Sequence, residues 1–363
     1  MVDHRVQGPI RVVGAGLLGA SIGLAMRERG VDVVLDDNSP SNLRLAIDYG
    51  AGRAGQPDDR FELVVVAVPP DVTAATVAAE LAAHPEALVT DVASVKALPL
   101  QELIALGADV SRYIGSHPMA GRERGGAVSA RADLFVGRPW IIASHEGITD
   151  RRAAAVENLA LDLGATPIEM NVAEHDASVA LVSHVPQVVA SLLAARLRKA
   201  SDLTIGLAGQ GLLDTTRIAA SAPDLWVQIL SANSLPVVEV LRSFATDLDA
   251  LIGALDDPAA PGARRTLAEA LSAGNDGVAR IPGKHGSRKH FSTLVVMVVD
   301  KPGELARLLA EIGELGVNME DLRLEHSPGA QFGLAEIAVV PEAEKQLVAE
   351  LEARGWKIAG EQQ

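Results

Sequence analysis

Apolar and polar positions alternate in blocks along the first part of the chain, and each block has the length of a strand or a helix. Ile10–Val13 is a short, mainly apolar segment that predicts a strand, and the continuous apolar run Leu63–Val68 predicts a strand that is buried on both faces. The segments Leu17–Arg29 and Asp71–Ala83 have helical spacing. Because such alternation is typical of a parallel sheet covered by helices, we expect a doubly wound α/β domain over residues 1–171.

The strand pattern stops after Val172, where long stretches rich in Ala and Leu predict helices. These are Ala177–Lys199, Leu203–Ala220, Ala222–Ser231 and Leu235–Leu255. Helices that are apolar over so much of their surface must pack on each other or on a second subunit. We expect residues 172–285 to form a helical substrate and dimerisation domain, shared within a homodimer; a bundle within one chain is the alternative.

The last part of the chain alternates between strand and helix patterns again. Ser272–His290 is rich in Gly, Lys and Arg, which indicates a linker. Residues 290–363 then carry the order βαββαβ, with predicted elements at Thr293–Val299, Glu304–Leu315, Asn318–Glu325, Leu334–Val340, Ala343–Arg354 and Trp356–Ala359. The predicted fold class is therefore α/β: a Rossmann-like doubly wound sheet, an all-α dimerisation domain and a ferredoxin-like domain.

Composition narrows the choice of partners. The 47 acidic and 32 basic residues give a formal charge of -15, whereas nucleic acids and anionic membranes bind positive surfaces, so we expect neither as a main partner. The absence of cysteine excludes disulfides and thiolate catalysis and fits a reducing interior. No apolar run approaches the roughly 20 residues of a membrane helix. We expect a cytoplasmic protein that acts on a small molecule.

A glycine-rich loop directly follows the first strand and opens the first helix. Its residues are Gly14, Gly16, Leu17, Leu18 and Gly19. The glycines permit a tight turn and a close approach to a pyrophosphate, which the N–H groups of the helix then face. Asp36 or Asp37, at the end of the second strand, would bind ribose hydroxyls and repel the 2′-phosphate of NADP. NAD is the expected cofactor; a glycine-rich turn without a nucleotide is the alternative.

Two polar residues follow strands, at the edge of the sheet where ligands of such folds bind. Ser94 comes after the strand at Ala87–Thr90, and His117 after the strand at Tyr113–Gly115. His117 is a candidate general base, because the ordinary pKa of histidine lies near neutrality. Ser94 is a candidate helix cap and a candidate hydrogen-bond partner of His117. A purely structural role is the alternative for each.

The helical segment carries further polar residues. His175 and His184 would lie on nearly opposite faces of a straight helix, and no ligand cluster accompanies them, so we expect no metal site. Arg217 lies in an otherwise apolar predicted helix, and its charge needs a partner. That partner is either a bound anion or an internal carboxylate such as Asp214, and helix physics alone favours the internal pair.

Together these stretches resemble the prephenate dehydrogenase family, the cyclohexadienyl dehydrogenases of tyrosine biosynthesis. The matching motifs are GAGLLGASIG, TDVASVK, GSHPMAG, EHD, SHVPQ, TTRIAAS and IPGKHG. The resemblance implies an oxidative decarboxylation in which a hydride passes to NAD, a histidine takes the hydroxyl proton and a ring carboxylate leaves as CO2. It implies that His117 is the base, that Ser94 orients it and the nicotinamide, and that Arg217 holds a substrate carboxylate.

The same resemblance implies a substrate side lined by His175, Asp176, His184 and Gln187. The resemblance implies a second histidine at position 187 in many relatives, whereas this chain has Gln187. The sequence is therefore compatible with two substrates, prephenate and arogenate, which has an added amino group. A different two-domain hydroxyacid dehydrogenase would need a catalytic lysine, and Lys199, at a helix end, is the only lysine in that region. A non-enzymatic, NAD-binding amino-acid sensor is a further alternative.

The segment Phe291–Ile358 resembles an ACT domain. Its stretches DKPGEL and GVN are similar to the turn and interface motifs of that family. The resemblance implies pairing across subunits and binding of an amino acid, here tyrosine as an end-product inhibitor. The residues implied are Asp300, Gly303, Leu305 and Asn318. Dimerisation without a ligand is the alternative.

Overall fold

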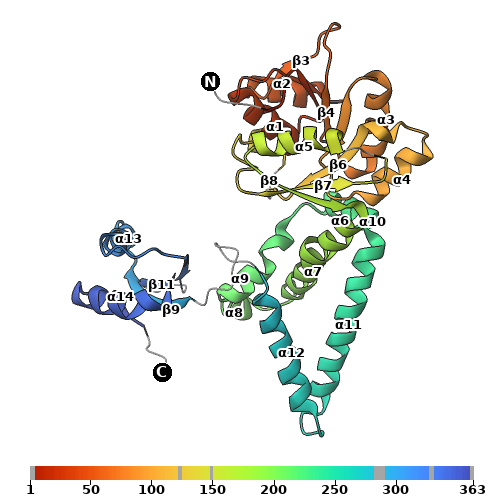
Figure 1. The fold of residues 1–363 in the computed structure, drawn as a ribbon. Helices are drawn as coiled ribbons and strands as arrows, with labels where there is room; N and C mark the ends of the chain where they lie inside the picture. The colour runs from red at the N-terminus through yellow and green to blue at the C-terminus, as the bar shows by residue number, and fades with distance from the viewer. Residues whose placement is uncertain (1–4, 122–124, 148–149, 282–290, 327–330, 360–363) are drawn as a thin grey trace. The chain divides into compact units, whose positions relative to one another are not determined.

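The computed structural model describes residues 5–121, 125–147, 150–281, 291–326 and 331–359. The chain forms two units. One comprises Met1–Ala200 and Thr215–Phe244, and the other Ser201–Asp214 and Ala245–Gln363. The first unit contains an eight-stranded sheet and the second a four-stranded sheet (Figure 1).

The large sheet has the order β3-β2-β1-β4-β5-β6-β7-β8. Its strands are β1 (Ile10–Val13), β2 (Val33–Asp36), β3 (Arg53–Ala54), β4 (Leu63–Val66), β5 (Leu88–Asp91), β6 (Tyr113–Pro118), β7 (Pro139–Ser144) and β8 (Thr166–Asn171). The pairings from β3 to β6 are parallel, which confirms the predicted Rossmann-like core. The antiparallel pairing of β7 with β6 was not predicted. The strand order reverses between β1 and β4, and ligands of such sheets bind at that switch point.

Helices cover both faces of the large sheet. They are α1 (Leu17–Glu28), α2 (Pro40–Asp48), α3 (Pro70–Ala83), α4 (Ala97–Ala105) and α5 (Asp150–Asp162), with 3-10 turns η1 (Val110–Arg112) and η2 (Ala127–Ser129). Leu63 and Val65 of β4 belong to the buried cluster shared with α1, α2 and α5, whereas Val64 and Val66 belong to the cluster shared with α3 and α4. Because successive strand residues point to opposite faces, β4 is buried on both sides, as its apolar run predicts.

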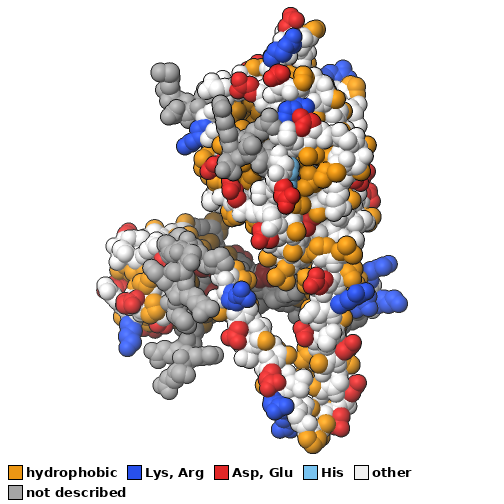
Figure 2. All heavy atoms as spheres, turned by 45° about the vertical axis from the view of Figure 1, so that its right-hand side comes forward, with side chains coloured by type: hydrophobic (Ala, Val, Ile, Leu, Met, Phe, Trp, Pro, Cys, Tyr) orange, Lys and Arg blue, Asp and Glu red, His pale blue; other side chains and the backbone are white. Residues whose placement is uncertain are grey.

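Helices follow β8. They are α6 (Val172–Val179), the π-helical turn η3 (Ala180–His184), α7 (Val185–Leu197), α8 (Asp202–Ile205), α9 (Gln210–Thr216), the 3-10 turn η4 (Arg217–Ala220), α10 (Pro223–Ala232), α11 (Ser234–Asp256) and α12 (Ala263–Val278). The prediction of one helix over Leu203–Ala220 is wrong. Gly206 and Gly209 lie between α8 and α9, and glycine has a low helix propensity. Hydrophobic side chains lie at the surface of the long helices (Figure 2).

The predicted linker Ser272–His290 begins too early. Helix α12 continues to Val278, because the Ala and Leu residues around it favour a helix in spite of two glycines. Residues 282–290 of the predicted linker, which include most of the IPGKHG motif, lie outside the described residues.

The run Val172–Leu197, from α6 to α7, is long and apolar enough by length and composition to cross a membrane. The expectation that no segment reaches this length is therefore wrong. In the most apolar 18-residue window of this run, 33% is buried. Its buried polar residues, His175, Asp176 and His184, are hydrogen-bonded to groups on the sheet and on other helices, so the run is an integral part of the first unit.

The small sheet has the order β10-β11-β9-β12, and every pairing is antiparallel. Its elements are β9 (Ser292–Val299), α13 (Glu304–Glu314), β10 (Asp321–His326), β11 (Phe332–Val339), α14 (Pro341–Ala353) and β12 (Lys357–Ile358). Leu294, Val296 and Ile337 of the sheet pack with Ile312 of α13 and Leu351 of α14 in one buried cluster. The chain order is βαββαβ, the order that the sequence predicts.

Candidate active site

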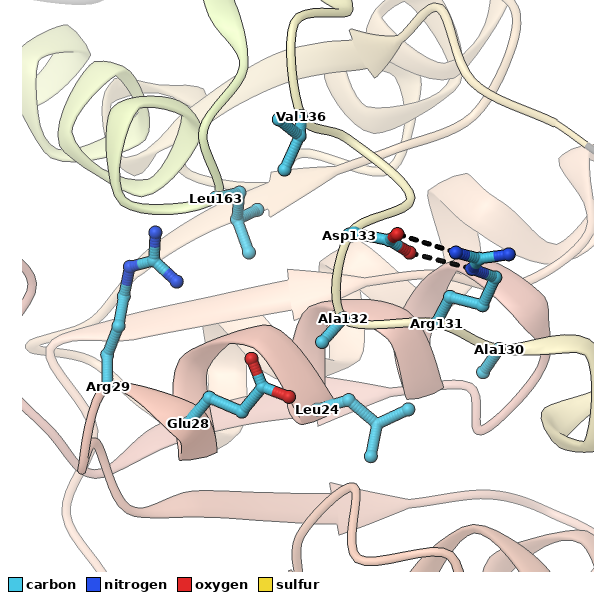
Figure 3. Close-up of a pocket in the computed structure, with 9 residues that line it drawn as sticks. All are labelled: Leu24, Glu28, Arg29, Ala130, Arg131, Ala132, Asp133, Val136 and Leu163. Carbon is cyan, nitrogen blue, oxygen red and sulfur yellow. Dashed lines mark hydrogen bonds and ion pairs between the residues drawn. The ribbon is translucent and has the colours of Figure 1, made fainter. Parts of the chain in front are cut away.

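A surface hollow lies at the end of α1 that is farther from the glycine-rich loop. It is lined by Leu24, Glu28, Arg29, Ala130, Arg131, Ala132, Asp133, Val136 and Leu163 (Figure 3). Its ion pair joins Arg131 and Asp133 at 2.6 Å. Because α1 starts at the carboxyl edge of the sheet and runs back, the hollow lies at the opposite edge from the one where α/β folds bind ligands. None of the predicted site residues lines it.

The glycine-rich loop at the carboxyl end of β1 leaves no room for side chains at two positions. Gly14 has a φ of 101°, and a Cβ added there would lie 2.4 Å from the carbonyl oxygen of Ala67. A Cβ on Gly19 would lie 1.9 Å from the carbonyl oxygen of Gly14. The loop therefore folds tightly against β4 and α1, as the motif predicts.

The same loop is open on its outer side. A Cβ added to Gly16 would meet no atom within 4 Å, and Gly16 precedes α1 without any side-chain cap. Leu17 and Leu18 are the first residues of the helix, so their N–H groups have no intrahelical acceptor. Such a helix N-terminus fits the pyrophosphate of a dinucleotide.

The two aspartates at the end of β2 have different partners. The carboxylate of Asp37 accepts hydrogen bonds from the N–H of Ala15 at 2.7 Å and of Ser39 at 2.8 Å, so it lies against the glycine-rich loop. The carboxylate of Asp36 is paired with Arg11 at 2.5 Å. Asp37 is therefore the better placed of the two for a ribose beside the loop.

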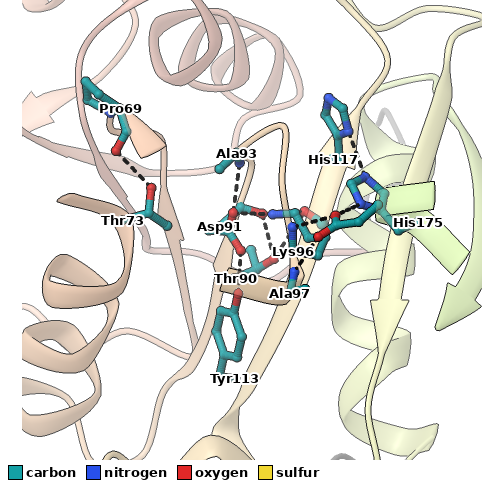
Figure 4. Close-up of polar contacts among 12 residues, drawn as sticks. Pro69, Thr73, Thr90, Asp91, Ala93, Lys96, Ala97, Tyr113, His117 and His175 are labelled. Carbon is teal, nitrogen blue, oxygen red and sulfur yellow. Dashed lines mark hydrogen bonds and ion pairs between the residues drawn. The ribbon is translucent and has the colours of Figure 1, made fainter. Parts of the chain in front are cut away.

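His117 lies near the end of β6, at the carboxyl edge of the sheet, and keeps 8% of its surface exposed. Its Nδ1 is 2.9 Å from Nε2 of His175, and Nδ1 of His175 is 2.7 Å from Oδ1 of Asp176. The Asp176 carboxylate accepts the backbone N–H groups of Lys96 and Ala97, both at 2.9 Å. A chain of hydrogen bonds thus runs from the N-terminus of α4 to the imidazole of His117 (Figure 4).

These contacts determine which nitrogen of His117 is basic. An ionised carboxylate only accepts hydrogen bonds, so Nδ1 of His175 carries the proton. Neutral His175 then accepts at Nε2, which requires a proton on Nδ1 of His117. The lone pair of His117 is left on Nε2, which makes no hydrogen bond with the described part of the chain.

Burial, more than nearby charge, keeps this chain of histidines neutral. It lowers the pKa of His117 well below its ordinary value, and the ammonium of Lys96 and any proton on His175 lower that pKa further. Burial also lowers the pKa of His175, although the hydrogen bond to Asp176 opposes the shift. Burial lowers the pKa of His184 to about 4. At neutral pH His117 is therefore an uncharged base.

His184 lies beside Asp176. Its Nδ1 is 3.0 Å from Nδ2 of Asn233, which also donates to the backbone oxygen of Asp176 at 2.8 Å. The ring of Trp226 lies edge-on to His184, 6.0 Å away. The prediction that His175 and His184 lie on opposite faces of a straight helix is wrong, because the π-helical turn η3 between them changes the helical phase.

Ser94 does not take either of its predicted positions. Helix α4 begins at Ala97 with Lys96 as N-cap and no capping side chain of its own, so the prediction of Ser94 as the cap is wrong. Asp176, from α6, binds the N–H groups at that end instead. Ser94 is half-buried in the turn before α4, and Nδ1 of His117 is bonded to His175.

Gln187 and Arg217 lie farther along the helical segment. The side chain of Gln187, on α7, is buried and donates to Oγ of Ser191 at 3.4 Å. Arg217 begins the 3-10 turn η4, which packs on α7, and its side chain is exposed. Oδ1 of Asp214, a predicted partner of Arg217, accepts from Nε2 of Gln210 at 2.8 Å. A cavity shared by Arg217 and His117 remains a prediction.

A buried ion pair that was not predicted from the sequence lies beside the histidines. Lys96 and Asp91 are 1% and 0% exposed, and Nζ of Lys96 is bonded to Oδ1 of Asp91. The hydroxyl of Tyr113 donates to Oδ2 of Asp91 at 2.7 Å. A signal was present in the TDVASVK motif, where an acidic residue ends a continuous apolar strand and a lysine follows. Asn233, by contrast, lies in an unremarkable stretch.

The predicted regulatory residues lie in the second unit. Gly303 has a φ of 92° and precedes α13, so it occupies a left-handed turn that favours glycine. The N–H of Asp300 donates to the backbone oxygen of Gln331 at 3.0 Å. Leu305 packs on the buried cluster, and Nδ2 of Asn318 donates to Glu320 at 3.1 Å.

The chain matches two family profiles. "Prephenate dehydrogenase, nucleotide-binding domain" matches residues 22–169, and "prephenate dehydrogenase, dimerization domain" matches residues 171–269. A relative described as probable prephenate dehydrogenase NovF, from Streptomyces niveus, is 37% identical over 359 residues, which cover 95% of this chain and 98% of the relative.

Two solved structures are similar to the chain. Prephenate dehydrogenase from Aquifex aeolicus, described in complex with hydroxyphenyl propionate and NAD+, has a TM-score of 0.66 and 25% identity, and the match covers 75% of this chain and 98% of that one. Synechocystis arogenate dehydrogenase has a TM-score of 0.61 and 28% identity, and the match covers 74% of this chain and 99% of that one. The two profiles and the relative show that the chain belongs to the prephenate dehydrogenase family of NAD-dependent oxidoreductases.

Proposed function

We propose that this chain oxidises and decarboxylates prephenate to 4-hydroxyphenylpyruvate, with NAD as the hydride acceptor. The observation that carries the proposal is the hydrogen-bond chain from Asp176 through His175 to His117. It leaves the neutral Nε2 of His117 without a hydrogen bond to the described residues, at the edge of the sheet that carries the dinucleotide loop. A dehydrogenase that acts on an alcohol needs such a base beside its nicotinamide.

The residues present fit NAD. The open N-terminus of α1 beyond Gly16 would hold the pyrophosphate, and the carboxylate of Asp37 would accept ribose hydroxyls while repelling a 2′-phosphate. When bound, NAD supplies the acceptor for the hydride. Ser94, in the turn after β5, lies at the same edge of the sheet as His117 and is proposed to line the nicotinamide side.

His117 then accepts and holds the proton of the substrate hydroxyl. Nε2 of His117 takes the hydroxyl proton of the substrate while a hydride leaves the ring carbon that bears this hydroxyl, so the C–O bond becomes a carbonyl. His175 and Asp176 stabilise the imidazolium that forms, because each hydrogen bond in the chain then strengthens. Loss of the ring carboxylate as CO2 makes the ring aromatic, and the proton returns from His117 to the product oxygen.

The choice between prephenate and arogenate concerns the side chain of the substrate. The relative from Streptomyces niveus is described as a probable prephenate dehydrogenase, whereas the Synechocystis structure is an arogenate dehydrogenase. Arg217 and Gln187 are proposed to recognise the substrate carboxylates, with His184 on the same side. The other reading of the site is arogenate oxidation.

We also propose the wider setting of the enzyme. The match to a dimerisation-domain profile and the exposed apolar residues of α7 and α11 support a homodimer. The βαββαβ unit is proposed to be an ACT-like domain that binds tyrosine through Asp300, Gly303, Leu305 and Asn318 and inhibits the enzyme. A cytoplasmic location is consistent with the absence of cysteine.

An assay of NADH formation tests the function. We expect turnover on prephenate that exceeds turnover on arogenate, NAD to be preferred over NADP, and tyrosine to inhibit. Replacing the base, His117→Asn, should lower kcat about 100-fold to 10,000-fold while the Kd for NAD changes little.

His84→Asn, at a partly exposed histidine of the same sheet domain, is the matched control and should leave the rate unchanged. Folded protein that binds NAD and tyrosine but turns over neither substrate would instead support the amino-acid sensor.

A further inference from the structure

Lys96 occupies a slot built for its side chain. The lysine is 1% exposed, and its Nζ is bonded to Asp91 (Figure 4). A Cβ added to Gly115 of β6 would lie 2.8 Å from Cδ of Lys96 and 3.1 Å from the hydroxyl oxygen of Tyr113. Only glycine at that position leaves room for the lysine stem. Fully buried lysines are rare and need a partner, so the slot beside Gly115 and the bond to Asp91 are specific for a lysine at position 96.

The same residue holds two carboxylates. Its ammonium is bonded to Asp91, and its backbone N–H donates to Oδ1 of Asp176 at 2.9 Å. Asp176 is in turn bonded to His175, which is bonded to His117. Lys96 therefore connects a buried ion pair to the hydrogen-bond chain of the base.

Lys96 is also one of several charged or titratable groups that face the base. His175 of α6 is bonded to His117, Asp176 of α6 is bonded to His175, and His184 of η3 lies close enough to affect the pKa of His117. Lys96 faces it from the start of α4, with its partner Asp91 at the end of β5. An ammonium in a dry interior opposes a second positive charge nearby, because the low dielectric screens it poorly.

We propose that the buried Lys96–Asp91 pair positions and tunes the base: it seats the N-terminus of α4 on Asp176 and fixes an ammonium beside the hydrogen-bond chain that ends at His117. The role rests on the proposed function, since it concerns the proton transfer of that reaction. Lys96 is a positioning residue, because its side chain is buried, its Cδ lies against Gly115 and its ammonium is bonded to Asp91.

The test compares neutral and charged replacements in the full chain. Lys96→Met removes the charge and keeps most of the stem, and Lys96→Arg keeps the charge. Without the nearby positive charge the pKa of His117 should rise, so the acid limb of kcat/KM should move to higher pH by about one unit. The rate below that limb should fall about tenfold, and Lys96→Arg should restore the limb toward that of the natural enzyme.

A second readout keeps the proposal testable whether or not the protein turns over prephenate. NMR titration of the labelled histidine rings, with His117→Asn used for assignment, reports the pKa of His117 directly. If Lys96→Met does not fold, Lys96→Gln serves as the neutral variant. Arg131→Met, which removes a positive charge from an exposed ion pair of the same domain, is the matched control.

The outcomes separate the two proposals. An inactive natural enzyme with a shifted His117 titration in the neutral variant would count against the proposed function alone. An active enzyme whose acid limb and His117 titration are the same in the natural, neutral and Lys96→Arg proteins would overturn the role of Lys96, because a purely structural lysine changes stability and leaves the pKa in place.

Discussion

Among single residues, the two aspartates after β2 make different predictions about cofactor binding. Asp37 is hydrogen-bonded to the glycine-rich loop, whereas Asp36 is paired with Arg11. We therefore expect Asp37→Ser to weaken NAD binding about tenfold, as loss of a charged hydrogen bond does, and to reduce the discrimination against NADP. Asp36→Asn should change the Kd for NAD less than about twofold.

Isothermal titration with each dinucleotide measures both effects, and thermal unfolding of the variants shows that the loop remains folded. If Asp36→Asn lost NAD affinity while Asp37→Ser kept it, the assignment of the ribose ligand would be reversed.

Sequence patterns identified the residues of the site better than their partners. The strand pattern predicted His117 at the carboxyl edge of the sheet, although β6 extends to Pro118 and includes His117, which was expected to follow the strand. Its partner His175 was placed on the substrate side by resemblance alone, and the contact between them joins residues far apart in the chain. Local propensity predicted Ser94 as the N-cap of α4, but the carboxylate of Asp176 from α6 binds the N–H groups at that helix end. Tertiary contacts decided both cases.

At the scale of elements, the N-terminus of α4 depends on a carboxylate that belongs to another helix. Burial alone would raise the pKa of Asp176, but the hydrogen bonds from His175 and from the N–H groups of Ala97 and Lys96 outweigh it and lower the pKa. The folded state therefore binds this proton more weakly than the unfolded chain. The resulting stabilisation is present above the unfolded value of about 3.9 and is lost as pH falls through the lowered folded value.

We expect Asp176→Asn to lower the free energy of unfolding by about 1.5–3 kcal/mol at pH 7. The difference from the natural protein should shrink at acid pH, as Asp176 becomes protonated in the natural protein. Urea unfolding at several pH values measures it. Asp133→Asn, in an exposed ion pair, is the control and should cost less than about 1 kcal/mol. An equal and pH-independent loss in both variants would contradict the role of Asp176 as a helix cap.

Elements were predicted well where their hydrophobic period was regular and poorly where the backbone departs from it. Strand β4 follows from a continuous apolar run, and β1 from a short segment that is apolar except at Arg11. The π-helical turn at Ala180–His184 cannot be recognised from a 3.6-residue hydrophobic pattern, so the predicted placement of His175 and His184 on opposite helix faces was wrong. Helix α12, Ala263–Val278, was not predicted, and the predicted linker overlaps its C-terminal part, where Gly274 and Gly277 lower the helix propensity.

For the whole molecule, the alternation of patterns along the chain predicted the order of its parts: a doubly wound sheet, then helices, then a βαββαβ unit. What one chain's sequence lacks is the identity of the surface that covers an apolar face. Phe244, Leu248, Ile252 and Leu255 of α11 recur at helical spacing and are 46%, 45%, 46% and 60% exposed. We call these four residues the α11 stripe.

A single exposed leucine needs no explanation, but a stripe that repeats along a helix indicates a contact surface. If the α11 stripe packs in a homodimer, then Leu248→Glu would bury a charge without a partner and should convert the dimer to a monomer in light scattering after size exclusion. Ala250→Glu, on the opposite side of the same helix, adds the same charge and should remain a dimer. A Leu248→Glu variant that stays dimeric, or a natural protein that is monomeric at micromolar concentration, would leave the bundle within one chain as the explanation, and α11 would then pack on helices of its own subunit.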